Sequence, residues 1–180
     1  MINSKCKNQK GYTLLFAVLV SAVLLSIGVS IITLNRKEFE LSSSSRDSTI
    51  AFYAADSGLE CALFHDQNGD KFANNDISGI KCAGMSPTMK IVSGNYWLFD
   101  FKLPDVGGDG IENDPCVSVD VTRQFVPDTF GGTILRTTIN SRGYNNGWNP
   151  SGGICGAGGT QEGLKTPNRV ERALQYIYFK

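Results

Sequence analysis

Residues 11–34 read GYTLLFAVLVSAVLLSIGVSIITL, and this stretch determines the first element of the fold. No charged side chain occurs between Tyr12 and Leu34, and the next charge is Arg36. At about 1.5 Å of rise per residue, these 23 residues form a helix of roughly 35 Å, which is long enough to cross a bilayer. The sequence therefore predicts a transmembrane helix over residues 12–35.

The polar leader before this helix is MINSKCKNQK, followed by Gly11. It carries Lys5, Lys7 and Lys10 and no acidic residue. Because positive charges stay on the cytoplasmic side of a membrane, we expect the N-terminus inside the cell. The chain would pass once through the cytoplasmic membrane, and the remaining residues would lie outside it.

Beyond the leader, the charge balance excludes one class of partner. The 180 residues carry a formal net charge of zero, and without the three leader lysines 14 basic residues face 17 acidic ones. No basic patch is present to release counterions from a phosphate backbone, so we expect no nucleic-acid partner. The length leaves room for one globular domain after the helix.

Cysteine usage fits an exported domain. Cys61, Cys82, Cys116 and Cys155 follow the apolar helix, an even number in a compartment that favours disulfides. Three pairings are possible. We prefer Cys61–Cys82 with Cys116–Cys155, because neighbours in the sequence close the shortest loops. In the chain-entropy model, each bridge contributes about 3–4 kcal/mol to stability.

Two simple interpretations of the N-terminus are a cleaved signal peptide and a plain membrane anchor. The apolar run is longer than the usual core of a signal peptide, and no A-x-A cleavage motif follows it. The junction Lys10-Gly11-Tyr12-Thr13-Leu14-Leu15 adds a third interpretation, because it resembles the prepilin cleavage site of type IV pilins.

The resemblance implies that a prepilin peptidase cleaves after Gly11, that Tyr12 becomes the methylated N-terminus, and that the helix is retained. It also implies that the helix contacts other pilin subunits. Most major pilins have Glu as the fifth mature residue, whereas Phe16 stands at that place here. A neighbouring N-terminal amine would therefore lack its carboxylate partner.

Residues 36–66 are polar but compatible with a helix that continues from the membrane segment. Apolar and small residues recur there at helical spacing, namely Ile50, Tyr53, Ala54, Ser57, Cys61 and Phe64. The run from Arg46-Asp47 through AFYAADSGL at 51–59 is similar to a segment of the PilX-type minor pilins. Those proteins commonly have an apolar fifth mature residue, and Phe16 agrees with that.

Residues 67–180 are predicted to form a globular β-sheet domain. Alternating patterns at 95–103, 116–126, 132–143 and 169–179 indicate strands, and their order favours an antiparallel sheet. One sheet face would cover the amphipathic helix, which gives an α+β fold, as in pilins. The Gly- and Asn-rich segment 143–168 is predicted to be a loop pinned by Cys155.

The loop after the helix contains a candidate calcium site. Asp66, Asn68, Asp70 and Asp76 supply the oxygen ligands that calcium prefers. The EF-hand pattern fails, because Lys71 replaces its Gly and Ile77 replaces its closing Glu. A polar helix-exit loop without a metal is the alternative. A second acidic loop spans Asp105 to Asp114 and includes Asp109, Glu112 and Asn113.

No catalytic motif occurs in the sequence. His65 is the sole histidine, and no nucleophile elbow, Walker or dinucleotide loop is present, so we do not expect an enzyme. The first hypothesis is a structural subunit, a minor pilin that initiates or decorates a filament. The second is a pseudopilin of a secretion or DNA-uptake system. The third is a membrane-anchored binding protein with a surface ligand.

Overall fold

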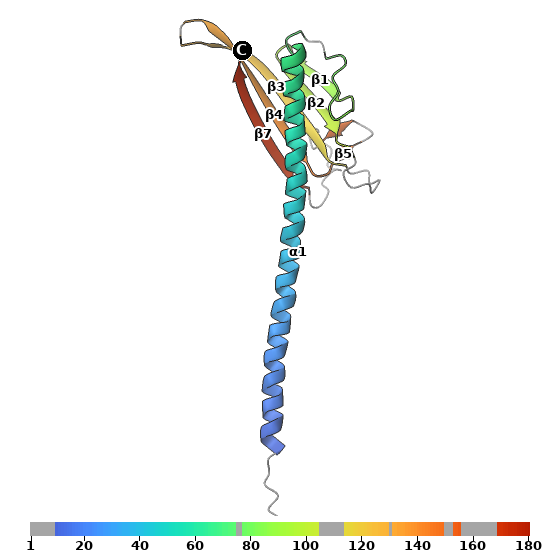
Figure 1. Cartoon of the computed structure of the whole chain (residues 1–180), viewed down its shortest axis with the longest axis vertical. Coiled ribbons are helices and arrows are strands. Elements are labelled where there is room, and N and C mark those ends of the chain that lie inside the picture. Colours follow the sequence, from blue (N-terminus) through green and yellow to red (C-terminus); the bar gives the residue numbers. More distant parts are fainter. Residues whose placement is uncertain (1–9, 75–76, 105–113, 130, 150–152, 156–168) are drawn as a thin grey trace, which may run out of the picture. The chain divides into compact units, whose positions relative to one another are not determined.

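The computed structural model describes residues 10–74, 77–104, 114–129, 131–149, 153–155 and 169–180. Its elements in chain order are α1 (Lys10–Gly69), β1 (Thr88–Ser93), β2 (Tyr96–Lys102), β3 (Cys116–Pro127), β4 (Thr133–Tyr144), β5 (Trp148–Asn149), β6 (Ile154–Cys155) and β7 (Glu171–Phe179). Figure 1 shows them coloured along the chain. The chain divides into two compact units, Met1–Ser43 and Ser44–Lys180.

The first unit contains the N-terminal part of α1. The helix passes without interruption through the four serines at 42–45. Serine is a weak helix former, yet each residue there keeps helical geometry. The amphipathic helix predicted to end at residue 66 continues to Gly69, and its residues from Ser44 onward belong to the second unit.

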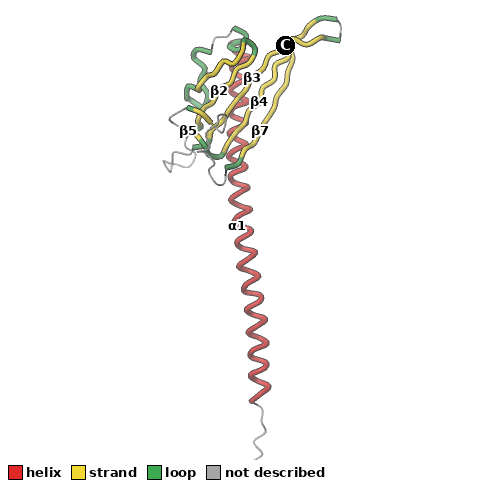
Figure 2. The backbone as a smooth tube through the Cα atoms, turned by 180° about the vertical axis from the view of Figure 1, so that it is seen from behind, coloured by secondary structure: helices red, strands yellow, loops and turns green. Residues whose placement is uncertain are grey.

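The second unit is built on a five-stranded antiparallel sheet with the order β1-β2-β3-β4-β7 (Figure 2). The C-terminal part of α1 packs across one face of this sheet. The α+β fold with a long N-terminal helix on an antiparallel sheet is therefore confirmed. β2, β3, β4 and β7 correspond to the four predicted strands.

The core lies between α1 and the sheet, and the strands supply most of its volume. Aromatic side chains of β2 pack beside valines of β3, because the paired residues point to the same face. The buried members from these two strands are Trp97, Phe99, Phe101, Val117, Val119 and Val121. Phe72, just beyond the helix, stacks against Phe99 with ring centroids 6.2 Å apart.

The helix contributes small residues to this interface. Ala51, Ala55, Gly58 and Ala62 are buried, whereas Tyr53 and Phe64 of the predicted apolar stripe are 65% and 61% exposed. The predicted stripe is therefore right at Ala54, which is fully buried, and wrong at Tyr53 and Phe64. The reason is close packing, because the aromatic rings already fill the sheet side and leave room only for small side chains.

Two glycines permit the close approach of helix and sheet. A Cβ atom on Gly143 of β4 would meet the backbone of Ala51 and Ala55, and the carbonyl carbon of Ala54 at 2.9 Å. A Cβ atom on Gly58 of α1 would lie 2.6 Å from a methyl group of Val117. The Ser141 hydroxyl completes the contact by donating to the Ala55 carbonyl at 2.6 Å.

The segment predicted as a loop at 143–168 is partly ordered into strands. Gly143 and Tyr144 belong to β4, and β5 pairs with β6 as a separate two-stranded sheet. The Cys116–Cys155 disulfide joins β6 to β3, and Tyr144 and Trp148 pack around it as a second, smaller core. The other disulfide is Cys61–Cys82, so the structure has the preferred pairing.

Candidate functional site

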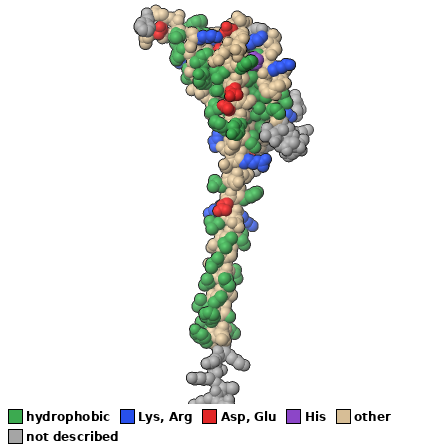
Figure 3. Space-filling view, in the orientation of Figure 1, with side chains coloured by type: hydrophobic (Ala, Val, Ile, Leu, Met, Phe, Trp, Pro, Cys, Tyr) green, Lys and Arg blue, Asp and Glu red, His purple; other side chains and the backbone are tan. Residues whose placement is uncertain are grey.

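The N-terminal part of α1 is the most distinctive functional feature. Its most apolar stretch has a mean hydropathy of 2.7, and none of that stretch is buried within the protein. Among the described residues, this is the one helix long and apolar enough to span a membrane. Figure 3 shows its hydrophobic side chains exposed along the helix. Such a surface requires lipid or other helices around it.

The hydroxyl groups of this segment are satisfied within the helix itself. Ser21 donates to the Val18 carbonyl at 2.9 Å, and Ser30 donates to the Ser26 carbonyl at 2.9 Å. Thr33 donates to the Ser30 carbonyl at 2.8 Å. An apolar environment therefore meets no unpaired donor at these three positions, which suits both a bilayer and a bundle of helices.

The residues of the expected processing site lie at the beginning of this helix. Gly11 is the second residue of α1, and Tyr12 follows it with 76% of its surface exposed. Phe16 lies about one turn further along and is also exposed. Gly28 has open space around its Cα, so no contact within the chain requires a glycine there.

A buried polar cluster closes the other end of α1. Asp66 is fully buried, and its carboxylate accepts a hydrogen bond from the Tyr178 hydroxyl. The guanidinium of Arg123 lies 3.8 Å from the same carboxylate as an ion pair. Arg123, Thr137 and Tyr178 occupy one cross-strand row of β3, β4 and β7, so the sheet presents them together to the helix.

The surroundings of Tyr178 shift the pKa of its phenol. Burial raises the pKa of its phenol well above the ordinary value, and the hydrogen bond to Asp66 and the negative charge of Asp66 raise this pKa further. The phenol therefore stays protonated as a donor over the physiological range. The cluster fixes the last strand to the helix rather than preparing a group for proton transfer.

The candidate calcium ligands are placed differently from one another. Asp66 is engaged by Tyr178 and Arg123, and Asn68 is exposed. Asp70 is exposed and pairs with the Lys180 ammonium, which lowers the pKa of Asp70 through a hydrogen bond and a charge interaction. Asp76 lies outside the described residues. Calcium binding stays a prediction, to be measured as melting with and without calcium.

The second acidic loop falls mostly outside the described residues, which include Asp114 but not residues 105–113. Asp114 is buried and forms an ion pair with Lys102 of β2. Within the described part of the chain, no group of three or more His, Cys, Asp or Glu side chains is placed to hold a metal ion.

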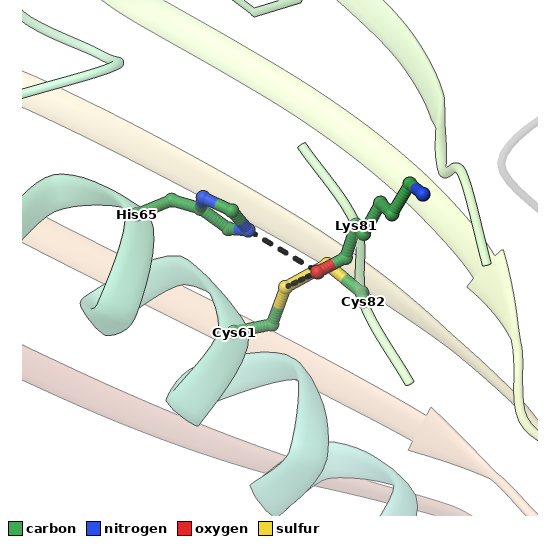
Figure 4. The surroundings of a disulfide bond; sticks show 4 residues. All are labelled: Cys61, His65, Lys81 and Cys82. Atoms are coloured by element: carbon green, nitrogen blue, oxygen red, sulfur yellow. Dashed lines mark hydrogen bonds between the residues drawn. A yellow bond between two sulfur atoms is a disulfide. The ribbon is translucent and has the colours of Figure 1, made fainter. Parts of the chain in front are cut away.

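His65 lies beside a disulfide, as Figure 4 shows. Its Nε2 atom donates to the Lys81 carbonyl at 3.2 Å, and that carbonyl oxygen also lies 3.7 Å from the Cys61 sulfur. His65 follows Cys61 by one turn of α1, while Lys81 precedes Cys82. The histidine thus supports the bridge between the helix and the segment after it, which is a structural role.

The sheet face away from α1 carries a row of polar side chains that the sequence analysis did not identify. Gln175 donates to the Asn140 side-chain oxygen at 2.6 Å, and Asn140 donates to Asp120 at 2.6 Å. Arg142 lies 4.0 Å from the same Asp120 carboxylate. Only the strand register brings these residues together, since they come from β3, β4 and β7.

Comparison with known proteins gives no family for this chain. No known protein family, no curated protein and no solved structure matches it.

Proposed function

We propose that this chain is a structural subunit of a type IV pilus-like filament, of the minor pilin class. The observation that carries the proposal is the division of α1 into two parts with different surroundings. Residues 12–34 are apolar and exposed, whereas the part from Ser44 onward packs on a disulfide-bonded sheet. A filament subunit needs an exposed apolar segment for assembly and a folded domain for display.

The apolar part of α1 supports two successive environments. Before assembly it lies in the cytoplasmic membrane as a single pass, with the N-terminus inside. After assembly the same surface is covered by the helices of other pilin subunits. The internally bonded hydroxyls of Ser21, Ser30 and Thr33 are compatible with either surrounding, because they need no partner outside the helix.

Processing is the step that commits the chain to assembly. A prepilin peptidase cleaves after Gly11, which removes the lysines that hold the N-terminus in the cytoplasm. Tyr12 becomes the methylated first residue of the mature subunit. Without those charges, the helix can leave the lipid and enter the filament.

Phe16 favours a minor subunit over a major one. A major pilin uses a carboxylate at this place to neutralise the N-terminal amine of a neighbour. Phe16 provides no charge and exposes 59% of its surface. The subunit therefore fits a place in the filament where it has no such amine to neutralise, and its sheet domain is displayed outward.

Mass spectrometry of the mature N-terminus tests this function. In cells that carry a prepilin peptidase, the chain is expected to begin at methylated Tyr12. Gly11→Leu should leave the leader in place, while the matched variant Gly28→Ala should be processed normally, since nothing lies within 4 Å of a Cβ atom there.

An intact Met1, or cleavage beyond Ser30, would contradict the filament proposal and favour a plain anchor or a signal peptide. Normal processing of Gly11→Leu would contradict the assigned cleavage site. Filaments sheared from the cell surface should contain the mature chain. A mature chain found only in the periplasm would indicate a pseudopilus instead.

A further inference from the structure

Two asparagines of the chain directly precede a glycine, Asn68 before Gly69 and Asn146 before Gly147. At such a pair, the backbone nitrogen of the glycine can attack the side-chain amide carbon, because glycine has no side chain to hinder the approach. Asparagine is accordingly one of the chemically labile residues of proteins. The two pairs share the same intrinsic chemistry, so their surroundings in the fold decide which of them reacts.

The pair at Asn68 is exposed but held in helical geometry, since Asn68 and Gly69 are the last two residues of α1. In a helix the backbone N–H groups bond to carbonyls four residues earlier, so the glycine nitrogen points along the axis and is already engaged. The turn is also fixed from below, because Asp66 is buried and accepts a hydrogen bond from Tyr178. Ring closure at Asn68 would have to break this arrangement.

The pair at Asn146 lies in the connection between β4 and β5. Neither residue belongs to a helix or strand, and Asn146 is partly exposed to solvent. Gly147 has a φ angle of 117°, a conformation that glycine adopts readily and other residues do not. Because Gly147 takes no part in the strand pairing on either side, the regular hydrogen bonds of a ladder do not oppose movement of its nitrogen.

We propose that Asn146 is a modification site, at which asparagine converts spontaneously to aspartate and isoaspartate through a cyclic imide with Gly147. A bond forms between the Gly147 nitrogen and Cγ of Asn146, the bond from Cγ to Nδ2 breaks, and the glycine amide proton leaves with the released ammonia. A solvent water molecule then opens the imide. Attack at Cγ gives aspartate, and attack at the backbone carbonyl gives isoaspartate. The reaction needs only water and does not rest on the proposed function.

Either product adds a negative charge close to Arg169. A Cβ atom on Gly147 would lie 3.4 Å from Nε of Arg169, so this guanidinium lies beside the link that reacts. The same guanidinium lies over the ring of Tyr144, with 4.2 Å between its central carbon and the ring centroid. Its positive charge attracts the new carboxylate, which favours the charged products.

Isoaspartate also lengthens the backbone by one carbon atom, between two ends that are fixed. On one side, the Asn145 N–H donates to the Val170 carbonyl at 3.3 Å, and the Asn145 side chain accepts from the Val170 N–H at 2.7 Å. On the other side, Trp148 packs around the Cys116–Cys155 disulfide. The added length must therefore displace one of these contacts.

Peptide mapping of the full-length chain in detergent tests the site. The folded chain, with both disulfides intact, is incubated at mildly alkaline pH in water labelled with heavy oxygen, and is then digested. Mass spectrometry follows the peptides that contain Asn68 and Asn146, and the label marks each conversion that occurred during incubation. Position 146 should convert several-fold faster than position 68. Equal rates, or a faster rate at the more exposed Asn68, would overturn the proposal.

The reduced and denatured chain is the matched control. The two rates should become similar there, because glycine follows both asparagines and the fold no longer distinguishes them. A preference for position 146 that persists in the denatured chain would assign the reactivity to local sequence and would overturn the role of the fold.

The products and one variant test the two steps of the argument separately. Fragmentation of the peptide should show isoaspartate at position 146, whereas aspartate alone would contradict the imide route, since direct hydrolysis of the side chain gives only aspartate. Tyr178→Phe loosens the end of α1 and should accelerate conversion at Asn68 while leaving Asn146 unchanged. Acceleration at Asn146 alone would contradict the explanation given for the protection of Asn68.

Discussion

Gly143 is the residue at which the packing of α1 on the sheet is most easily tested. Gly143→Ala places a Cβ atom against the backbone of Ala51 and Ala55, which cannot move aside as a flexible side chain can. Overpacking of this kind costs about 1–3 kcal/mol, so the melting temperature should fall by several degrees. Thermal unfolding in detergent, followed by circular dichroism, measures the change.

The control for this substitution is Gly132→Ala, which precedes the same strand and has open space around it. It should change the melting temperature little. Equal effects of the two variants would show that the loss of glycine itself, and not the contact with α1, decides the outcome.

Substitution of Tyr178 tests how much the buried polar cluster at the end of α1 stabilises the fold. Tyr178→Phe keeps the ring but removes the hydroxyl that donates to Asp66, so a buried carboxylate loses a hydrogen bond. We expect a loss of about 1.5–3 kcal/mol in the free energy of unfolding, measured by denaturant titration. Lys180→Ala breaks the exposed pair with Asp70 and should change the free energy of unfolding far less than Tyr178→Phe, because solvent screens the pair.

The raised pKa of Tyr178 also predicts how stability depends on alkaline pH. The folded chain holds the phenol proton above the ordinary pKa of 10.0, at which the unfolded chain releases it. The stabilisation is therefore complete below pH 10.0 and is lost as the pH rises above that value. Stability measured from pH 8 to 11 should fall less steeply for Tyr178→Phe, and an unchanged slope would contradict the assignment.

Among the elements, the sequence predicted the apolar first part of α1 better than the buried face of its second part. The uncharged run over residues 12–34 predicts an exposed apolar helix from composition alone. The buried face of the second part was predicted correctly at Ala54 but wrongly at Tyr53 and Phe64, to which hydrophobicity pointed. Burial instead follows Ala55 and Gly58, whose small size matters only once the sheet is in place.

Some strands can likewise be predicted from a pattern within the strand, whereas others depend on pairing with residues far away in the sequence. Alternation in β3 is visible in the sequence as Val117, Val119 and Val121. β1 was not predicted, because its six residues become a strand through pairing with β2 at the sheet edge. The contact between Asp66 and Tyr178 spans 112 residues, so no spacing in the sequence indicates it.

We expect the Cys116–Cys155 disulfide to hold the small sheet of β5 and β6 against the rest of the domain. It closes a separation of 39 residues, and the Cys155 backbone N–H donates to Asp100 at 3.1 Å. Replacing both cysteines with serine should cost about 4 kcal/mol by the chain-entropy model. In this variant, hydrogen exchange of the backbone amide at position 155 should rise far more than that of Val119, and equal protection would contradict the role of the bridge.

For the whole molecule, the division into two compact units predicts that the second unit folds without the first. A fragment of residues 44–180 keeps the sheet, both disulfides and the helix segment that covers the core. It lacks residues 12–34, whose exposed apolar surface requires lipid, detergent or other helices. The fragment should therefore be soluble without detergent and melt at the temperature of the full chain in detergent. Aggregation of the fragment, or a melting temperature lower by many degrees, would mean that the first 43 residues stabilise the sheet domain.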